Sequence, residues 1–137
     1  MLVVLDTNVL LSALRAERSP PAVIMDAWRA GRFMLVTSRE QTEEFKRAAD
    51  YPKLRPYLPR RAVGRVVNEL RSAEIVLERL RRVGDSPDPG DDYLLAMALA
   101  SDAEILVTGD KSLLSLKRIG VTTLVPPRRF AIMLSRR

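Results

Sequence analysis

Short apolar runs alternate along the chain with longer stretches of helical period. The first run, 2–5, is apolar at every position, which is typical of a strand buried on both faces of a parallel sheet. The segment 73–83 fits either a short strand near 74–77 or a continuation of the helix before it, and the pattern favours neither. The expected strands are 2–5, 33–36, 104–107 and 121–125.

Capping residues, prolines and glycines mark the helix boundaries. Thr7 or Asn8 can cap the first helix, Pro20 and Pro21 open the second, and Ser38 is a good N-cap for the third. The expected helices are 9–15, 20–30, 39–50, 60–71, 91–101, 112–117 and a terminal helix from 128.

The order of these elements predicts the fold class. Strands that alternate with helices form βαβ crossovers, and these produce a central parallel sheet covered on both faces. The functional crevice of such a sheet lies beyond the carboxyl ends of its strands. A loop is expected at 84–90, where Pro87 and Pro89 interrupt both patterns. Because no repeat or long linker divides the chain, we expect one domain over 1–137.

Composition limits the possible chemistry. The chain has 137 residues and contains neither Cys nor His. Thiol nucleophiles, disulfides, Cys/His zinc sites and imidazole bases are therefore excluded together, and any chemistry falls to carboxylates, hydroxyls, Lys or Arg. The longest unbroken apolar run, 93–100, is eight residues, far below the roughly 20 that span a bilayer. With no secretory pattern at its start, we expect a cytoplasmic protein that does not enter a membrane.

The formal charge is +6, and the charged residues are unevenly distributed. Eight arginines lie in 55–82 against three glutamates, whereas 85–92 holds four aspartates. This separation suits a phosphodiester substrate, because a basic surface can hold phosphates while an acidic centre holds metal ions. We expect Arg60, Arg61 and Arg65 to hold the backbone phosphates of such a substrate. The alternative is a solvated helix face that only keeps the protein soluble.

Acids from four distant segments are expected to meet at the carboxyl ends of the strands. One ends the first strand, one lies in the second turn of the helix after the second strand, one opens the helix near 91, and one follows the strand 104–107. In chain order these acids are Asp6, Glu44, Asp91 with Asp92, and Asp110.

Such a group of acids requires a cation. Two carboxylates about 5 Å apart repel by roughly 3 kcal/mol at an effective dielectric constant near 20. With oxygen as the available hard ligand, Mg²⁺ or Mn²⁺ is favoured over zinc or copper. These ions polarise a phosphodiester and activate water. Each acid alone could be an ordinary turn, cap or solvent-facing residue, so the hypothesis depends on their joint placement.

Four sequence blocks together resemble a PIN domain, the metal-dependent nuclease family that includes the VapC-type toxins of toxin–antitoxin pairs. The motif Asp-Thr-Asn at residues 6–8 is weak alone, but the blocks follow the family's order and spacing over nearly the whole chain. The closing segment 125–130 also resembles the tail of a subgroup of toxin components. The four blocks are 3–10, 38–45, 88–92 and 106–110.

The resemblance implies a three-layer α/β/α sandwich with a central parallel sheet, Mg²⁺ or Mn²⁺ held by acids, and hydrolysis of RNA. It also implies a small antitoxin partner and a homodimer. Asn8 and Thr108 would orient the acids through hydrogen bonds. Asp92 is a further candidate metal ligand; the small residues that follow rank Asp91 first, but the choice between the two stays open. The catalytic acids implied by the family are Asp6, Glu44, Asp91 and Asp110.

Rival families fail at particular positions. A HAD-type phosphatase needs a second acid two residues after the first, where this chain has Asn8. A phospho-receiver domain places its aspartate after a central strand, and Asp6 comes too early, although Lys111 could serve as its late lysine. No GxxxxGK[ST] segment exists, which excludes a P-loop NTPase. The alternative that we retain is a PIN-like domain that binds RNA or protein without cutting it.

Overall fold

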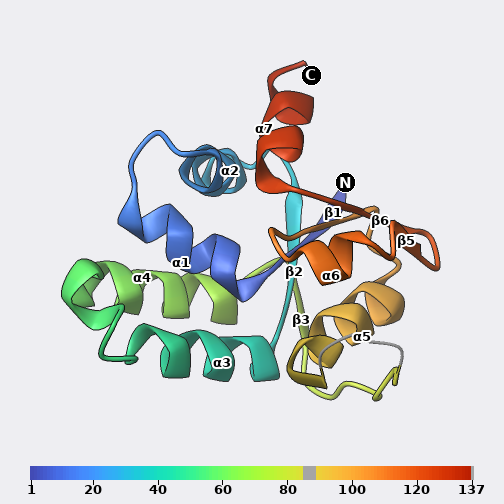
Figure 1. Cartoon of the computed structure of the whole chain (residues 1–137), viewed down its shortest axis with the longest axis horizontal. Coiled ribbons are helices and arrows are strands. Elements are labelled where there is room, and N and C mark those ends of the chain that lie inside the picture. Colours follow the sequence, from blue (N-terminus) through green and yellow to red (C-terminus); the bar gives the residue numbers. More distant parts are fainter. Residues whose placement is uncertain (85–88, 137) are drawn as a thin grey trace.

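The computed structural model describes residues 1–84 and 89–136, and a six-stranded sheet forms its centre (Figure 1). The strands are β1 (Leu2–Leu5), β2 (Met34–Ser38), β3 (Ile75–Leu77), β4 (Ile105–Val107), β5 (Arg118–Ile119) and β6 (Thr122–Val125). They lie in the order β3-β2-β1-β4-β6-β5. Every neighbouring pair is parallel except β5 with β6, so the carboxyl ends of β1, β2, β3, β4 and β6 open on one edge. We call this edge of the sheet the carboxyl edge.

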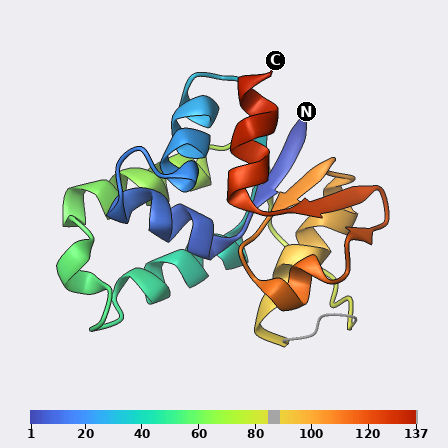
Figure 2. The same cartoon turned by 45° about the horizontal axis from the view of Figure 1, so that its top comes forward.

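Helices cover both faces of this sheet (Figures 1 and 2). On one face, Val3 and Leu35 belong to a core shared with α1, α2, α3, α4 and α7. On the other face, Val4 and Leu106 pack with residues of α5. The predicted three-layer α/β/α architecture is confirmed. The helices are α1 (Thr7–Arg15), α2 (Pro20–Arg29), α3 (Arg39–Ala49), α4 (Arg60–Arg71), α5 (Asp92–Ser101), α6 (Lys111–Leu114) and α7 (Pro127–Ser135).

Two 3₁₀ turns complete the helical elements, η1 (Arg55–Tyr57) and η2 (Pro89–Asp91). Of the helices that the structure describes, none is both long and apolar enough to cross a bilayer.

The cap of α3 confirms one predicted boundary, and the cap of α1 corrects another. Ser38 Oγ accepts the backbone N–H of Gln41 at 3.0 Å, as expected of an N-cap. A cap at Thr7 or Asn8 was the expectation for α1 and is wrong. Asp6 caps this helix, because its carboxylate accepts the backbone N–H of Asn8 and the helix already begins at Thr7.

Other differences from the sequence pattern lie at short elements. The ambiguous segment 73–83 contains β3, which pairs with β2 through Val36 opposite Ile75. The pattern missed β5, because two residues cannot display a period and this strand depends on antiparallel pairing with β6. Of the predicted loop at 84–90, residues 85–88 lie outside the described residues, and 89–91 form η2.

Candidate active site

Asp6 is a buried carboxylate at the carboxyl edge, where β1 passes into α1. Its side chain is only 4% exposed. One oxygen, Oδ1, accepts the backbone N–H of Asn8 at 3.0 Å, and the other, Oδ2, accepts the hydroxyl of Thr108 at 2.7 Å. Burial raises the pKa of Asp6 above its ordinary value, the two hydrogen bonds oppose that rise, and the negative charge of Asp110 adds to it.

Thr108 connects the acids at the ends of β1 and β4. It is fully buried, and its hydroxyl oxygen also accepts the backbone N–H of Asp110 at 3.1 Å. The Asp110 carboxylate turns to the N-terminus of α6, where Oδ1 accepts N–H groups of Ser112 at 2.7 Å and Leu113 at 3.3 Å. The predicted positioning contact from Thr108 to an acid is therefore present in the structure.

Tyr93 lies among three of the predicted acids, and the sequence reasoning missed it. Its hydroxyl is 2.7 Å from Thr7 Oγ1, one residue after Asp6. Burial raises the pKa of Tyr93, and the hydrogen bond to Thr7 opposes the rise. The negative charges of Asp6, Glu44 and Asp91 raise this pKa further.

Gln41 is a second residue that the sequence reasoning missed. It is buried, and its amide Nε2 donates to the backbone carbonyl of Leu5 at 2.6 Å, immediately before Asp6. This bond ties the first turn of α3 to the end of β1. The sequence does contain a sign of this role, because Gln41 stands three positions before Glu44 and residues at this spacing lie on the same side of a helix.

The structure distinguishes Glu44 from its acidic neighbours on α3. Glu44 is half-buried and pairs with Arg47, whereas Glu40 and Glu43 are exposed. Glu43 pairs with Arg39 at 3.7 Å. The negative charge of Glu44 adds to the raised pKa of Tyr93. Glu40 lies near Tyr93 as well, because it lines a hollow together with Tyr93 and Asp92.

The two aspartates before α5 have different surroundings. Asp92 accepts the backbone N–H groups of Val83 and Gly84, both at 2.9 Å, and so holds the segment that leads away from β3. Asp91 instead adds its charge to the surroundings of Tyr93. Asp92 therefore has a structural contact, and which of the two aspartates would hold a metal ion stays a prediction.

The remaining candidates contribute less directly. Asn8 supplies its backbone N–H to Asp6, while its side chain is exposed. On α4, Arg60 pairs with Asp50 at 3.0 Å and Arg65 lies 3.7 Å from Glu69, while Arg61 is exposed. Asp50 ends α3, six residues beyond Glu44 and thus about 9 Å further along the helix axis. The start of α4 therefore lies away from the acids.

The carboxylate oxygens at the carboxyl edge suit a hard divalent cation, although they are not arranged as a complete set of metal ligands. Within residues 1–84 and 89–136, no group of three or more acidic side chains is arranged so that it could hold a metal ion. Their partners show why: Asp110 turns to helix N–H groups and Glu44 to Arg47, which relieves like-charge repulsion. Asp6 has no such freedom because it is buried. Mg²⁺ or Mn²⁺ could be held by Asp6, Glu44, Asp91 and Asp110 only after side chains such as Asp110 and Glu44 leave these partners.

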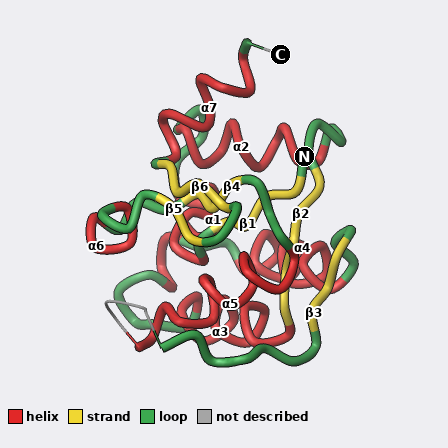
Figure 3. Tube along the Cα trace, turned by 90° about the vertical axis from the view of Figure 1, so that its right-hand side faces the viewer, coloured by secondary structure: helices red, strands yellow, loops and turns green. Residues whose placement is uncertain are grey.

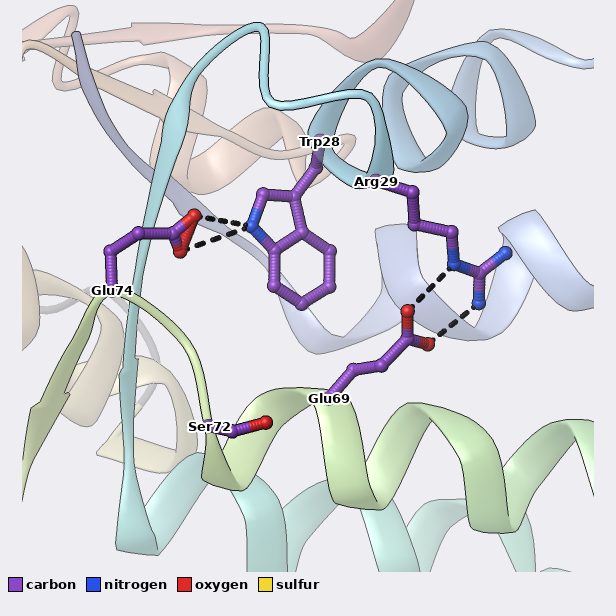
Figure 4. Close-up of a pocket in the computed structure, with 5 residues that line it drawn as sticks. All are labelled: Trp28, Arg29, Glu69, Ser72 and Glu74. Carbon is purple, nitrogen blue, oxygen red and sulfur yellow. Dashed lines mark hydrogen bonds and ion pairs between the residues drawn. The ribbon is translucent and has the colours of Figure 1, made fainter.

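A second group of charged side chains lies at the opposite, amino edge of the sheet (Figure 4). There Trp28 at the end of α2 donates its indole N–H to Glu74, just before β3. Arg29 and Glu69 form a two-point ion pair beside it. These residues line a hollow of about 300 Å³. It lies far from the acids, because every residue that lines it comes before a strand and not after one.

Comparison with known proteins places the chain in a family. The sequence matches the PIN domain family over residues 2–112. An uncharacterized protein of Methanocaldococcus jannaschii is 30% identical over 116 residues, which are 84% of this chain and 74% of that protein. The fold is similar to the solved PIN domain of human SMG5, with a TM-score of 0.54 and 13% identity over 97% of this chain and 98% of that one.

The chain belongs to the PIN domain family, as its sequence blocks predicted. Members of this family are usually nucleases and generally use divalent metals.

Proposed function

We propose that this protein is a Mg²⁺- or Mn²⁺-dependent endoribonuclease that hydrolyses phosphodiester bonds of RNA. The observation that carries the proposal is the state of Asp6. Its carboxylate is buried with a raised pKa, and among the described residues no cationic side chain pairs with it. A buried anion without a cationic partner is costly unless something else supplies the positive charge.

Several residues of the chain would have separate roles around the Asp6 carboxylate. Thr108 and the N–H of Asn8 fix both oxygens of Asp6, so its orientation is set before any ligand arrives. Asp110, Glu44 and Asp91 lie on more exposed positions and can turn toward a bound cation. When bound, the metal would polarise the phosphodiester and activate water. The Tyr93 hydroxyl is hydrogen-bonded to Thr7, the residue after Asp6.

The wider role that we propose is the toxin of a toxin–antitoxin pair. The support is the resemblance of the sequence blocks and of the segment 125–130 to toxins of this family. A small antitoxin protein and a homodimer are the partners that this role implies, and the cytoplasm is the place where it would act.

A second candidate function is an RNA- or protein-binding PIN-like domain that does not cut. One observation favours it: within the described residues, no three acids are arranged to hold an ion. The two functions differ in a measurable way, because only the first requires a divalent cation for turnover.

RNA cleavage by point variants tests the proposal. Purified protein is incubated with single-stranded RNA and Mn²⁺, then with EDTA, and Asp6→Asn and Asp110→Asn are compared with the parent chain. We expect cleavage by the parent, none in EDTA, and a loss of about 100-fold or more in both variants. Asp102→Asn is the matched control, because this aspartate is exposed at the end of α5. Equal cleavage by all variants would refute the assignment, and metal-independent RNA binding without cleavage would favour the second function.

A further inference from the structure

A second basic segment follows β3 and runs beside α5. Figures 1 and 3 show the chain passing α5 after it leaves β3. A hollow of about 550 Å³ opens between this segment and the helix. Arg79, Arg81 and Arg82 line it on one side, and Ala96 and Leu99 of α5 line it on the other. We call this hollow the α5 groove.

The arginines of the α5 groove differ from those of α4 in their pairing. Arg60 and Arg65 of α4 lie against carboxylates. Within the described parts of the chain, none of the three groove arginines forms an ion pair, and all three are exposed. Unpaired guanidinium groups keep their full charge and their donors for a ligand, and phosphate is the anion that their forked geometry suits.

The α5 groove also has an apolar wall. Leu99 is 41% exposed there, beside the small side chain of Ala96. Arginine opposite exposed apolar surface matches a nucleotide, which carries a phosphate on one side and the flat face of a base on the other. The faces of the bases are accessible in a single strand, whereas in a duplex they are covered by the neighbouring bases of the stack. The groove therefore favours an unpaired strand.

A second hollow connects the α5 groove with the acids. Its volume is about 230 Å³, and it shares Arg81, Arg82 and Ala96 with the groove. It is also lined by Tyr93, whose hydroxyl bonds to the residue after Asp6, and by the carboxylates Glu40 and Asp92. From Leu99 to Tyr93 the helix rises about 9 Å. A strand in the groove thus leads along α5 to the acids.

We propose that Arg79, Arg81 and Arg82 bind the phosphate backbone of a single-stranded RNA and guide it along α5 to the carboxyl edge. The proposal rests on the proposed ribonuclease function and names the path of its substrate. It moves the RNA contact from Arg60, Arg61 and Arg65 of α4, of which the first and the last pair with carboxylates, to the three arginines after β3.

RNA binding by two matched triple variants tests this path. Both are made in the Asp6→Asn background, in EDTA, so that cleavage does not interfere. One replaces Arg79, Arg81 and Arg82 by Ala, and the control replaces Arg60, Arg61 and Arg65 by Ala. Anisotropy of a fluorescein-labelled single-stranded RNA is measured from about 50 to about 200 mM salt, and circular dichroism confirms that each variant is folded.

We expect the groove variant to bind at least about tenfold more weakly and its log–log salt slope to fall by about 2, since each lost phosphate contact removes about 0.7. The α4 variant is expected to keep most of the affinity and slope. An α4 variant that loses as much as the groove variant, or a groove variant that binds like the parent, overturns the proposal. So does a duplex that binds as tightly as the single strand, or polyglutamate that competes as well as RNA.

The two proposals fail in different ways. If the unmutated chain cleaves RNA with Mn²⁺ while the groove variant binds and cleaves normally, the RNA path is wrong and the ribonuclease function stands. If the Asp6→Asn chain binds RNA through the groove but the unmutated chain never cleaves, the ribonuclease function is wrong and the groove stands as a binding site. If the chain binds no RNA at all, both are wrong.

Discussion

The carboxylates at the two edges of the sheet differ in the partners that surround them. At the amino edge, Glu74 accepts the indole N–H of Trp28 at 2.9 and 3.3 Å (Figure 4). Beside it, the two carboxylate oxygens of Glu69 accept hydrogen bonds from Nη2 and Nε of Arg29 at 2.8 and 2.9 Å. This hydrogen-bonded ion pair raises the pKa of Arg29. Each acid there has an N–H or cationic partner from a side chain.

The carboxyl edge has no such balance around Asp6. Its partners are a hydroxyl and a backbone N–H, and its charged neighbour is another acid, Asp110. Burial therefore raises the pKa of this carboxyl, whereas side-chain partners satisfy the acids at the other edge. The comparison teaches that a group of carboxylates is a candidate metal site when no positive charge balances it. The number of carboxylates alone does not decide this.

Catalysis should show the largest difference between the two edges. Asp6→Asn is expected to lower RNA cleavage in Mn²⁺ by about 100-fold or more, because it removes the buried negative charge without changing shape. Glu74→Gln is expected to leave the rate unchanged, since it keeps an acceptor for Trp28 at the far edge. Initial rates on a labelled RNA measure both. A slow Glu74→Gln enzyme would mean that the amino edge takes part.

Thermal stability in Mn²⁺ sharpens the same contrast. At a Mn²⁺ concentration of about 100 times its dissociation constant, binding stabilises the folded state by about 2.7 kcal/mol, or on the order of 8 °C in Tm. We expect this rise in the parent chain and in Glu69→Gln, and its loss in Asp6→Asn. Melting curves with Mn²⁺ and with EDTA provide the measurement. A rise that Asp6→Asn retains would place the ion elsewhere.

At the amino edge, the expected effect is on stability alone. Trp28→Phe leaves the Glu74 carboxylate without its indole donor and should lower the free energy of unfolding by about 1–2 kcal/mol. Urea denaturation measures this loss, and RNA cleavage below the unfolding range should stay at the parent level. A fall in activity with unchanged stability would contradict the purely structural role of this edge.

The smallest expected effect concerns the pH dependence of Asp6 in the metal-free protein. Its pKa in the folded chain is raised above 3.8, so the folded state holds this proton more tightly than the unfolded state does. The ionised carboxylate therefore costs stability above the folded-state pKa, and the cost disappears as pH falls through that pKa. Asp6→Asn should raise Tm in EDTA near neutral pH.

This gain should shrink as the solution is acidified toward about pH 4. Melting curves at a series of pH values measure it, with the exposed Asp102→Asn as the control. A gain that grows on acidification would contradict the raised pKa.

Most of the fold could be predicted because its signals are local. The apolar run of β1, the prolines that open α2 and the serine that caps α3 each act within a few residues, and the structure confirms these three elements. What the sequence did not reveal depends on distant partners. The two residues of β5 have no period of their own and form a strand only by pairing with β6.

Some of the contacts around Asp6 could also be predicted, while the roles of the acids stay predictions. Position after a strand identified Asp6 and Asp110, whose charges do interact. Tyr93 and Gln41 were missed because their roles come from bonds to Thr7 and to the carbonyl of Leu5, far away in sequence. The pairing of Arg60 with Asp50 is likewise a tertiary feature, whereas Arg65 and Glu69 are four residues apart on the same helix.

Anomalous diffraction from crystals grown with Mn²⁺ tests the central claim most directly, that the carboxyl edge lacks positive charge around Asp6 and that a divalent ion supplies it. The account predicts a manganese peak coordinated by Asp6, with Asp110 turned toward it, and no such peak in Asp6→Asn crystals. A carboxyl edge without manganese, or a peak only beside Glu69 and Glu74, would contradict it.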